Sequence, residues 1–404
     1  MLQGKTVLLG VTGGIAAYKM PNVARMLKKL HCNVHVLMTE NATNFITATT
    51  FETLTGNKCL IDTFDRNFEF SVEHVALAKQ ADLVLIAPAT ANVIGKIANG
   101  IADDMLTTTV MACTCKILIA PAMNHNMYRN PIVQANLEKL ENFGYEIISP
   151  ETGMLANGDI GEGKLPSEEV LLEYILKELA FEKDLLGKKV LVTAGATQEA
   201  IDPVRYITNH STGKMGYAIA KIAMQRGAQV SLITGKTALE PPQFVEVIKV
   251  ISAEEMYQEV INRASQMDVI IKAAAVADYR PSHIAEDKIK KSEGVSSISL
   301  ERTKDILGEL GSLKQKGIIH SFLCGFSMET KNLEENSKAK LEKKHLDMIA
   351  ANNLKVEGAG FGTDTNVITL ITNKGIRHLE RMSKEAVANE ILNEIQMFIS
   401  TYWK

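Results

Sequence analysis

The chain lacks the cysteine patterns of disulfide-rich and zinc-binding proteins. Its 404 residues contain five cysteines, an odd number, and none of them belongs to a C-x-x-C pair. Disulfide frameworks and most zinc sites need paired cysteines at set spacings, so the sequence disfavours both. Unpaired cysteines suit a reducing compartment, which favours the cytoplasm.

Long apolar runs and clusters of one charge are also missing. No apolar run is long enough to span a bilayer, and the start of the chain, MLQGKTVLLGVTGG, has no signal-peptide pattern, so we expect a cytoplasmic protein. The formal net charge is only -3, and no run of Lys and Arg is interleaved with aromatic residues. The sequence therefore argues against nucleic acid and anionic membranes as partners and leaves small anions.

Short apolar runs rich in β-branched residues alternate with helical stretches in both halves of the chain. The first half reads KTVLLGVTGG, IAAYKMPNVARMLKKL, CNVHVLMTE and ADLVLIAPAT, and the second reads KKVLVTAGAT, GYAIAKIAMQRG, AQVSLITG and MDVIIKAAAVADY. Such runs predict parallel sheets with helices on both faces. We expect two doubly wound, mostly parallel, Rossmann-like α/β domains at residues 1–180 and 189–404, joined by a linker at 181–188 that follows a helix from about Ser167 to Leu179.

Each half has a glycine loop between a strand and a helix. Such a loop brings the backbone and a helix N-terminus close to an anion. The first loop, GVTGGIAAYK at 10–19, departs from G-x-G-x-x-G, and the second, NHSTGKMG at 209–216, lacks G-x-x-x-x-G-K-[ST] because Met215 holds the Ser/Thr position. A dehydrogenase and a Walker ATPase are disfavoured. Each loop alone fits a phosphate cradle and a plain tight turn equally well.

Motifs along the whole chain together resemble one family. The first half contains GVTGGIAAYK, PATANVIGKIANGIADDMLTTT from residue 88, PAMNHNMY from residue 121 and GMLANGDIGEGK from residue 153. The second half contains TAGATQEAIDPVRYITNHSTGKMG, AAAVADYRP followed by EDKIKK, GFSMET, KAKLEKKHLD and GFGTDTN. With these motifs the chain resembles the bifunctional phosphopantothenoylcysteine decarboxylase/phosphopantothenate-cysteine ligases of bacterial coenzyme A synthesis.

The resemblance implies that residues 1–180 form a flavodoxin-like domain that uses FMN to decarboxylate phosphopantothenoylcysteine to 4'-phosphopantetheine. His74 matches the family's catalytic histidine, which can take a proton as the substrate thiol is oxidised. Asn124 matches the residue that holds the departing carboxylate with its N–H donors. Without the family, His74 fits a structural histidine and Asn124 fits an Asx turn. The residues implied to bind FMN are Thr12, Gly13, Gly14, Thr39, Pro88, Ala89, Thr90 and Asn92.

One position departs from the family pattern. The family lid usually carries a cysteine that is proposed to protonate the enethiolate intermediate, whereas this sequence has Asn157 at that place. Asparagine is not an acid, so water or another side chain supplies the proton, or the decarboxylase is slow or inactive. Because His74, Asn124 and the flavin motifs are present, we expect a working decarboxylase with an altered proton route. The alternative is a ligase fused to an inactive or regulatory flavin domain.

Residues 189–404 resemble the CTP-dependent ligase half, which condenses 4'-phosphopantothenate with cysteine through an acyl-cytidylate. The resemblance implies that Asn209 holds this intermediate, while backbone amides at 213–216 hold the anion. Lys288 matches an essential lysine that stabilises charge on the phosphates, although EDKIKK alone fits a solvated surface. Mg²⁺ is expected with the triphosphate, with no metal ligand assigned. The residues implied to bind CTP are Ala273, Ala274, Ala275, Asp278, Lys288, Asp305, Ile306, Phe326, Lys340 and Lys344.

Some of these residues carry a further local expectation. The alanines at 273–275 follow a strand and offer small side chains and free main chain to a base edge, although packing explains them equally well. Asp278 comes at the end of the same segment, where a carboxylate could approach Mg²⁺ or the triphosphate. Lys340 and Lys344 are four residues apart and are expected on one face of a helix. Phe326 offers a flat apolar face to the nucleotide, or else belongs to the core.

The resemblance also bears on assembly and on rival functions. Family flavin domains meet as trimers and family ligase domains as dimers, which implies a homo-oligomer. A third hypothesis makes the first half a binding module, like the related subunits that inhibit phosphatases, but the sequence has no long acidic tail. Related flavoenzymes that act on peptide cysteines or on prenyl transfer would leave residues 188–404 unexplained.

Overall fold

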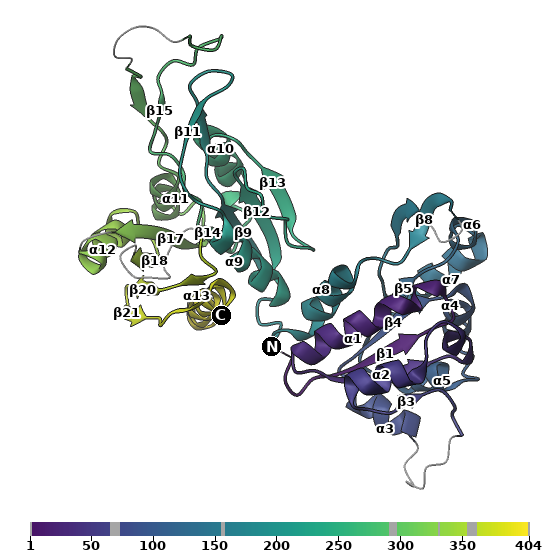
Figure 1. The fold of residues 1–404 in the computed structure, drawn as a ribbon. Coiled ribbons are helices and arrows are strands. Elements are labelled where there is room, and N and C mark those ends of the chain that lie inside the picture. The colour runs from purple at the N-terminus through teal and green to yellow at the C-terminus, as the bar shows by residue number, and fades with distance from the viewer. Residues whose placement is uncertain are drawn as a thin grey trace. The chain divides into compact units, whose positions relative to one another are not determined.

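The chain folds as two compact units, Met1–Phe181 and Glu182–Lys404 (Figure 1). The computed structural model describes residues 2–64, 73–154, 158–290, 297–329, 332–353 and 362–402. Both units are doubly wound α/β folds with mainly parallel sheets, so the expected fold class is confirmed. None of the helices in these ranges combines the length and the apolar character that crossing a membrane requires.

Unit 1 (Met1–Phe181) is built on a six-stranded parallel sheet with the order β3-β2-β1-β4-β5-β6. This is the strand order of dinucleotide-binding folds, in which ligands bind at the carboxyl ends of the strands where the order reverses. Here the order reverses between β1 and β4. The strands are β1 (Thr6–Val11), β2 (Asn33–Met38), β3 (Cys59–Leu60), β4 (Leu83–Ala89), β5 (Lys116–Pro121) and β6 (Glu146–Ile147).

The strands of unit 1 are buried on both faces, which explains their continuous apolar runs. Along β1, Val7 and Leu9 belong to the core under one helical layer, whereas Leu8 belongs to the core under the other. The first layer includes η1 (Ile15–Lys19), α1 (Met20–Lys29), η2 (Glu40–Asn44), α2 (Ala48–Thr55) and α8 (Glu168–Leu179). The second includes α3 (Glu73–Gln80), α4 (Ala91–Ala98), α5 (Met105–Ala112) and α7 (Pro131–Asn142), while α6 (His125–Tyr128) and the hairpin β7 (Glu151–Met154) and β8 (Ile160–Lys164) follow β5 and β6.

Unit 2 (Glu182–Lys404) repeats this order and extends it. Its eight-stranded sheet runs β13-β12-β9-β14-β17-β18-β20-β21, and the last two strands are antiparallel to their neighbours. The reversal lies between β9 and β14. The strands are β9 (Lys189–Ala194), β12 (Gln229–Thr234), β13 (Glu246–Lys249), β14 (Val269–Lys272), β17 (Phe322–Glu329), β18 (Met348–Asn353), β20 (Ile368–Thr372) and β21 (Gly375–His378).

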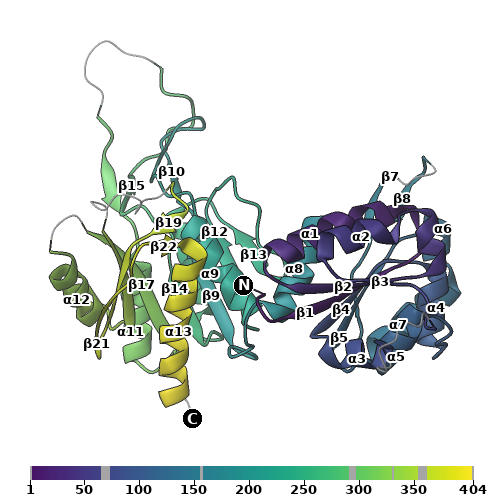
Figure 2. The same ribbon diagram turned by 60° about the horizontal axis from the view of Figure 1, so that its bottom comes forward.

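Helices cover both faces of the second sheet as well. On one face α9 (Lys214–Gln225) contacts β9 and β12, and α13 (Lys384–Tyr402) lies alongside α9 (Figure 2). On the other face α10 (Ala253–Ala264), α11 (Ile306–Gln315) and α12 (Leu333–Lys343) cover a core that includes Ile270 and Leu323. Three short antiparallel pairs complete the unit: β10 (Gln198–Ala200) with β11 (Tyr206–Thr208), β15 (Tyr279–Pro281) with β16 (Leu300–Arg302), and β19 (Thr365–Asn366) with β22 (Met382–Ser383).

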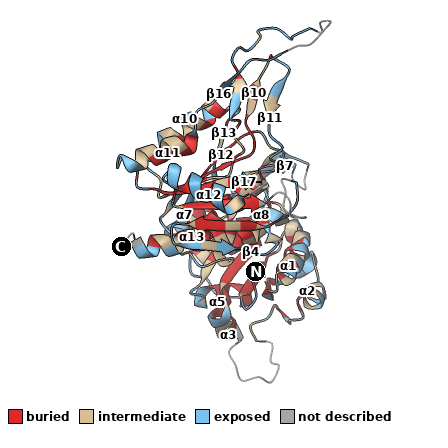
Figure 3. Ribbon diagram, turned by 90° about the vertical axis from the view of Figure 1, so that its left-hand side faces the viewer, coloured by how far each residue is buried: buried red, intermediate tan, exposed pale blue. Residues whose placement is uncertain are grey.

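Burial follows the strands in both units. Strands such as β4 and β12 are drawn mainly as buried, while the outer faces of α1, α2 and α10 are exposed (Figure 3). The helix expected from Ser167 to Leu179 is confirmed as α8, and the Ser167 hydroxyl accepts a hydrogen bond from the Val170 N–H at its start.

The segment at 181–188 packs against unit 2. Leu185 is buried and its N–H donates to the Arg226 carbonyl. Asp184 pairs with the nearly buried Arg226 guanidinium at 2.5 Å, and Lys183 donates to the Gln225 carbonyl at 2.7 Å. Most of this segment therefore belongs to unit 2, where it packs beside the end of α9 before β9 begins.

Candidate active sites

In unit 1, the loops after β1 and β4 are joined at the point where the strand order reverses. The buried Thr12 hydroxyl donates to the Pro88 carbonyl at 2.6 Å and accepts from the Thr90 N–H at 3.1 Å. Thr90 in turn begins α4, because its hydroxyl accepts from the Val93 N–H. Thr12, Pro88 and Thr90 are thus held side by side at the carboxyl edge of the sheet.

The loop after β2 closes against the same place. A Cβ atom on Gly13 would lie 2.6 Å from the Cβ of Asn41, so only glycine fits there. Thr39, which precedes η2, is buried, and its hydroxyl has no hydrogen-bond partner among the described residues. A buried hydroxyl without a partner costs free energy, which a ligand oxygen at this edge would recover.

The remaining residues implied for FMN lie on the same two loops. Gly14 precedes η1, and a Cβ atom there would be in ordinary contact, at 3.8 Å, with Pro88 and Thr90. Ala89 is buried as the last residue of β4, and Asn92 is exposed on the first turn of α4. All eight residues therefore lie at or next to the carboxyl ends of β1, β2 and β4.

Asn124 lies at the end of the neighbouring strand β5, where it begins α6. Its side-chain oxygen accepts from the Asn126 N–H at 2.9 Å, which is the Asx turn that the sequence left open. This bond occupies only the oxygen, so the amide N–H donors stay available for a carboxylate. The turn thus fixes the direction in which Asn124 presents its donors.

The hairpin β7–β8 packs on this turn. The Met123 N–H donates to the Gly163 carbonyl at 3.0 Å, and a Cβ atom on Gly161 would lie 2.8 Å from the Cβ of His125. His125 Nδ1 is buried and lies 3.9 Å from a carboxylate oxygen of Asp159, beyond hydrogen-bond distance. Asn157, which comes between β7 and β8 in the sequence, lies outside the described residues.

His74 lies on the first turn of α3 and its side chain is half-buried. None of the hydrogen bonds described for unit 1 links it to Thr12, Thr39, Thr90 or Asn124. The structure therefore brings together the residues that the resemblance implies for FMN and fixes the turn at Asn124, and no described hydrogen bond joins His74 to either group.

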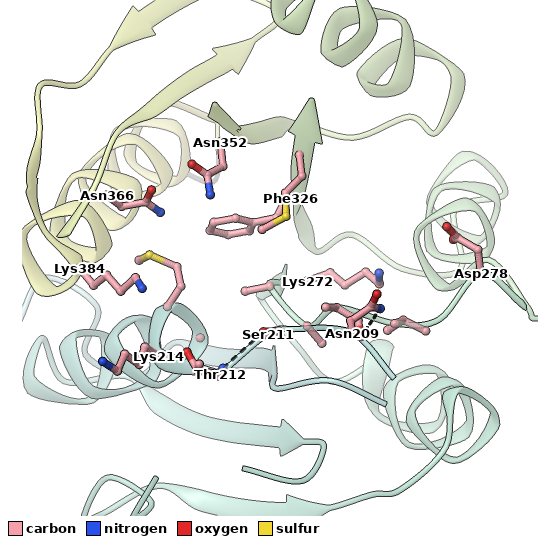
Figure 4. A pocket seen from close by; sticks show the side chains of 18 residues that line it. Asn209, Ser211, Thr212, Lys214, Lys272, Asp278, Phe326, Asn352, Asn366 and Lys384 are labelled. Atoms are coloured by element: carbon pink, nitrogen blue, oxygen red, sulfur yellow. Dashed lines mark hydrogen bonds between the residues drawn. The ribbon is translucent and has the colours of Figure 1, made fainter. Parts of the chain in front are cut away.

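Unit 2 has a cavity of about 350 Å³ at the carboxyl edge of its sheet (Figure 4). It lies where the strand order reverses, between the loop after β9 and the ends of β14, β17 and β18. Phe326, Asn352, Asn366 and Lys384 lie on one side and Ser211 and Thr212 on the other. The other lining residues are Asn209, Gly213, Lys214, Met215, Gly216, Lys272, Ala273, Ala274, Ala275, Val276, Asp278 and Met328.

The glycine loop of unit 2 leads directly into α9. Gly213 has a left-handed backbone, with φ of 82°, and no side chain caps the helix after it. A Cβ atom on Gly216 would lie 2.6 Å from the Cβ of Ala194, so the first turn packs directly on β9. The Gly213 N–H already donates to the Ser211 hydroxyl at 3.3 Å. The N–H groups that remain for an anion are those of the first turn of α9.

Lys214 is engaged elsewhere. Its ammonium donates to Asp364 at 2.7 Å and to the Gly362 carbonyl at 3.0 Å. These contacts hold the 362–366 segment next to the start of α9.

The expectation of free main chain at 273–275 is wrong for the N–H groups. Ala273 donates to the Thr193 carbonyl, Ala274 to the Thr193 hydroxyl at 3.1 Å, and Ala275 to the Gly195 carbonyl at 2.9 Å. The Ala275 carbonyl also accepts from the Asn209 side chain at 3.3 Å. The N–H groups are occupied because the run continues the parallel pairing with β9. The Ala275 carbonyl accepts from the Thr197 N–H as well as from Asn209, so the run offers a ligand the carbonyl groups of Ala273 and Ala274 and its small side chains.

A second cavity, of about 370 Å³, shares Lys272, Val276 and Asp278 with the first. Asp305 and Ile306 line it at the start of α11, together with Lys344. Its remaining lining residues are Ala277, Tyr279, Arg302, Thr303 and Lys304. Most of the residues implied for CTP thus lie around two adjoining spaces.

Lys344 and Asp305 form an ion pair at 2.7 Å, and Asp305 also caps α11 by accepting from the Gly308 N–H. Burial raises the pKa of the Asp305 carboxyl, but the bonds from Lys344 and Gly308 outweigh it and lower the pKa overall. Lys340, in the last turn of α12, donates to the Ser327 hydroxyl at 3.2 Å and lines neither cavity. Lys344 comes just after that helix, so both lysines have partners in the protein.

Lys288 is exposed and lines neither cavity. Its neighbour Ile289 is held from both sides: its N–H donates to buried Asp202 at 3.2 Å, and its carbonyl accepts from Arg205 at 2.7 Å. Arg205 also pairs with Asp202, and this bond, with the backbone N–H groups of Val204, Arg205 and Ile289, lowers the pKa of the Asp202 carboxyl. The β10–β11 hairpin therefore positions the loop that carries Lys288.

Sequence reasoning missed Lys272, Asn352, Asn366 and Lys384, which all line the first cavity. Lys272 and Asn352 had a signal, because each is a polar residue at or near the carboxyl end of an apolar strand. Burial lowers the pKa of Lys272 to about 8, and the positive charge of Lys344 acts in the same direction. Lys384 starts α13 far along the chain and had no local signal.

No metal site is evident in the parts of the chain that the structure describes. These residues contain no group of three or more His, Cys, Asp or Glu side chains that could hold a metal ion. Asp278, the carboxylate expected near Mg²⁺, is exposed and lines both cavities.

Comparisons with known proteins cover both units. Residues 1–180 match the Flavoprotein family, and residues 185–398 match the DNA/pantothenate metabolism flavoprotein C-terminal domain. The coenzyme A biosynthesis bifunctional protein CoaBC of Bacillus subtilis is 47% identical over 399 residues, which cover 98% of this chain and 97% of that protein. The CoaBC of Escherichia coli is 39% identical over 397 residues, with the same two coverages.

The comparisons also include a solved structure. The crystal structure of the C-terminal domain of a CoaBC protein is 42% identical and covers 55% of this chain and 100% of that chain, with a TM-score of 0.47. The family matches and the full-length relatives agree on the order of the two halves. The chain therefore belongs to the CoaBC family of coenzyme A biosynthesis bifunctional proteins.

Proposed function

We propose that the chain is a bifunctional enzyme of coenzyme A biosynthesis that first ligates 4'-phosphopantothenate to cysteine and then decarboxylates the product. One observation carries this conclusion: a single chain contains both units, each with a site at the reversal of its sheet, and relatives named as bifunctional match it over 98% of its length. A ligase fused to an inactive flavin domain is not favoured, because the whole first unit is retained together with its site.

Residues 189–404 carry the ligase reaction. The carboxylate of 4'-phosphopantothenate attacks the α-phosphorus of CTP, and pyrophosphate leaves as the acyl-cytidylate forms. The amine of cysteine then attacks the acyl carbon, and CMP leaves. The first turn of α9 supplies N–H groups for an anion, Asn209 lies beside Ala275 at the cavity, and Lys288 stabilises the phosphate charge.

The nucleotide occupies the adjoining cavities of unit 2 in this proposal. The carbonyl groups of Ala273 and Ala274 can accept from the amino group of cytosine, and Phe326 presents a flat apolar face. Asp278, Asp305, Ile306 and Lys344 line the second space. Mg²⁺ accompanies the triphosphate and screens its oxygens.

Residues 1–180 carry the decarboxylase reaction with FMN, and residues 181–188 connect the two domains. The fit rests on the orphaned Thr39 hydroxyl, on Gly13, which leaves no room for a side chain, and on the joined Thr12–Thr90 loops. FMN would accept two electrons from the substrate thiol and return them after carbon dioxide has left. His74 takes the thiol proton, and the Asn124 amide holds the carboxylate.

The proposal extends to the cellular location, the assembly and the partners of the protein. All five cysteines are free, which favours the reducing cytoplasm. Large apolar side chains such as Ile132 and Phe143 are exposed on unit 1 and favour association into a homo-oligomer. The partners are the small-molecule substrates, with no nucleic acid and no membrane.

The test follows the two products separately. Purified protein is given 4'-phosphopantothenate, cysteine, CTP and Mg²⁺, and pyrophosphate and carbon dioxide are measured. We expect both, and a preparation that is yellow from bound flavin. Pyrophosphate without carbon dioxide would support the inactive-domain alternative, and release of neither would refute the proposal.

A further inference from the structure

Lys272 occupies the junction between the two cavities of unit 2. It is the last residue of β14, and it lines both the 350 Å³ and the 370 Å³ spaces. In the sheet it pairs with Thr193 of β9 and Gly325 of β17. Gly325 has no side chain, and a Cβ atom there would lie 2.9 Å from a methyl carbon of Leu307 and 3.2 Å from one of Leu346, so only a residue as small as glycine fits beside Lys272 on that strand. Figure 4 shows its side chain between Phe326 and Asn209.

The ammonium group of Lys272 has no hydrogen bond or ion pair with any described residue. The charged groups around it are Lys344 and Lys340 of the α12 region, Asp305 at the start of α11, and Asp278 in the loop after β14. Asp305 is already paired with Lys344 at 2.7 Å, so Asp278 is its only nearby carboxylate without a described partner. Arg302 and Lys304 add further positive charge to the second cavity.

The charged form of Lys272 is unfavourable unless an anion lies beside it. Burial and the nearby lysines disfavour the charged form, and the pKa of Lys272 falls to about 8. A half-buried cation that lacks a partner is stabilised strongly by an anion that enters the same space.

We propose that Lys272 binds a phosphate group of the nucleotide at the junction of the two cavities. This role rests on the proposed ligase function, and it adds a side chain that the motif-based assignment does not contain. We assign this phosphate to the nucleotide because the residues implied for CTP lie on both sides of Lys272, along the alanine run and at the start of α11. A bound phosphate favours the charged lysine and raises its pKa, so nucleotide binding takes up a proton near pH 8.

The test is CTP binding by titration calorimetry with Mg²⁺, alongside pyrophosphate release. Lys272→Met should weaken CTP binding about tenfold to a hundredfold, the usual effect of losing a charged hydrogen bond. Its binding of 4'-phosphopantothenate should stay unchanged. The matched control is Lys249→Met, because Lys249 is also the last residue of a parallel strand in this sheet but is exposed and lines neither cavity.

The pH profile gives a second readout that does not depend on the methionine variant folding. CTP affinity of the wild-type protein should fall about tenfold between pH 7 and pH 9, as the free lysine loses its proton. Lys272→Arg keeps its charge throughout, so its affinity should not fall.

Two results would overturn the assignment while the function stands: pyrophosphate release with CTP affinity unchanged in Lys272→Met, or a loss confined to 4'-phosphopantothenate. An equal fall with pH in wild type and Lys272→Arg would also overturn it. If the wild-type protein releases no pyrophosphate, the proposed function fails instead.

Discussion

Unit 1 and unit 2 share the strand order 3-2-1-4-5-6 but differ in the groups at the reversal of that order. In unit 1 the edge carries hydroxyl and amide groups, from Thr12, Thr39, Thr90 and Asn124. In unit 2 it carries lysines, and Lys272, Lys344 and Lys384 line the cavities. The sheet order is thus common to both units, and the edge groups differ in charge, in keeping with the proposed FMN site in unit 1 and the proposed triphosphate site in unit 2.

The first loop of each unit shows how this difference arises. In unit 1 the chain passes from β1 through residues 12–14 directly into η1. In unit 2 the loop after β9 spans 195–213 and contains the β10–β11 hairpin. That insertion brings Asn209 to the cavity and lets Asp202 and Arg205 hold the Lys288 loop. A longer loop after the first strand thus adds side chains at this edge while the order of the sheet stays the same.

The largest expected effect comes from a substitution of His74, which should affect the activity of unit 1 alone. His74→Asn removes the proposed proton acceptor of the decarboxylase, so carbon dioxide release should fall by about 10²–10⁴-fold. Pyrophosphate release should not change, because unit 2 is untouched. Both products are measured in one reaction mixture, and an equal loss of both would show that the two sites are not independent.

The reciprocal change is Lys288→Gln. Loss of the positive charge should lower pyrophosphate release by about 10²–10³-fold, the range for removing one group that stabilises transition-state charge. Carbon dioxide release from supplied phosphopantothenoylcysteine should persist. The matched control is Lys290→Gln, an exposed lysine of the same loop. If both variants lose activity equally, Lys288 acts only through the general charge of the loop.

The strands, helices and strand-end loops could be predicted from the sequence because they depend on local patterns. Short apolar runs predicted parallel strands, and Ser167 followed by two glutamates predicted the start of α8. The loops at Thr12, Thr90 and Asn209 also lie at strand ends, as their motifs indicated. Each of these features is set by residues close together in the chain.

Features that depend on register and on distant pairing were not predictable. The N–H groups at 273–275 are occupied because the run continues the pairing with β9, which the alanines alone do not reveal. Lys344 is paired with Asp305, a residue 39 positions away. Lys272 matters only because β14 ends where two cavities meet. Sequence motifs identified the loops, and the sheet decided which groups remain available to a ligand.

A smaller effect is expected at the carboxyl edge of the unit 1 sheet, where the ligand-facing groups are uncharged. Thr12→Val removes a buried hydroxyl that both donates to Pro88 and accepts from Thr90, and losing such bonds costs about 1–3 kcal/mol. We expect roughly tenfold weaker FMN binding, measured by flavin fluorescence after dialysis, with pyrophosphate release unchanged. Thr53→Val on the exposed face of α2 is the control, because its hydroxyl bonds only within its own helix. Equal flavin loss in both variants would contradict a specific role for Thr12.

The smallest expected effect concerns the insertion that distinguishes unit 2. Asp202→Asn weakens the bond to Arg205 and the hold on Ile289, so pyrophosphate release should fall by up to about tenfold as the Lys288 loop moves. Arg205 keeps the pKa of Asp202 below its ordinary value of 3.8, so the carboxylate stabilises unit 2 above about pH 4, and this contribution is lost as the pH falls further. The difference in Tm between wild type and variant should therefore be present at pH 7 and shrink below pH 4. A difference that stays constant with pH would mean that packing, rather than the charge of Asp202, holds the loop in place.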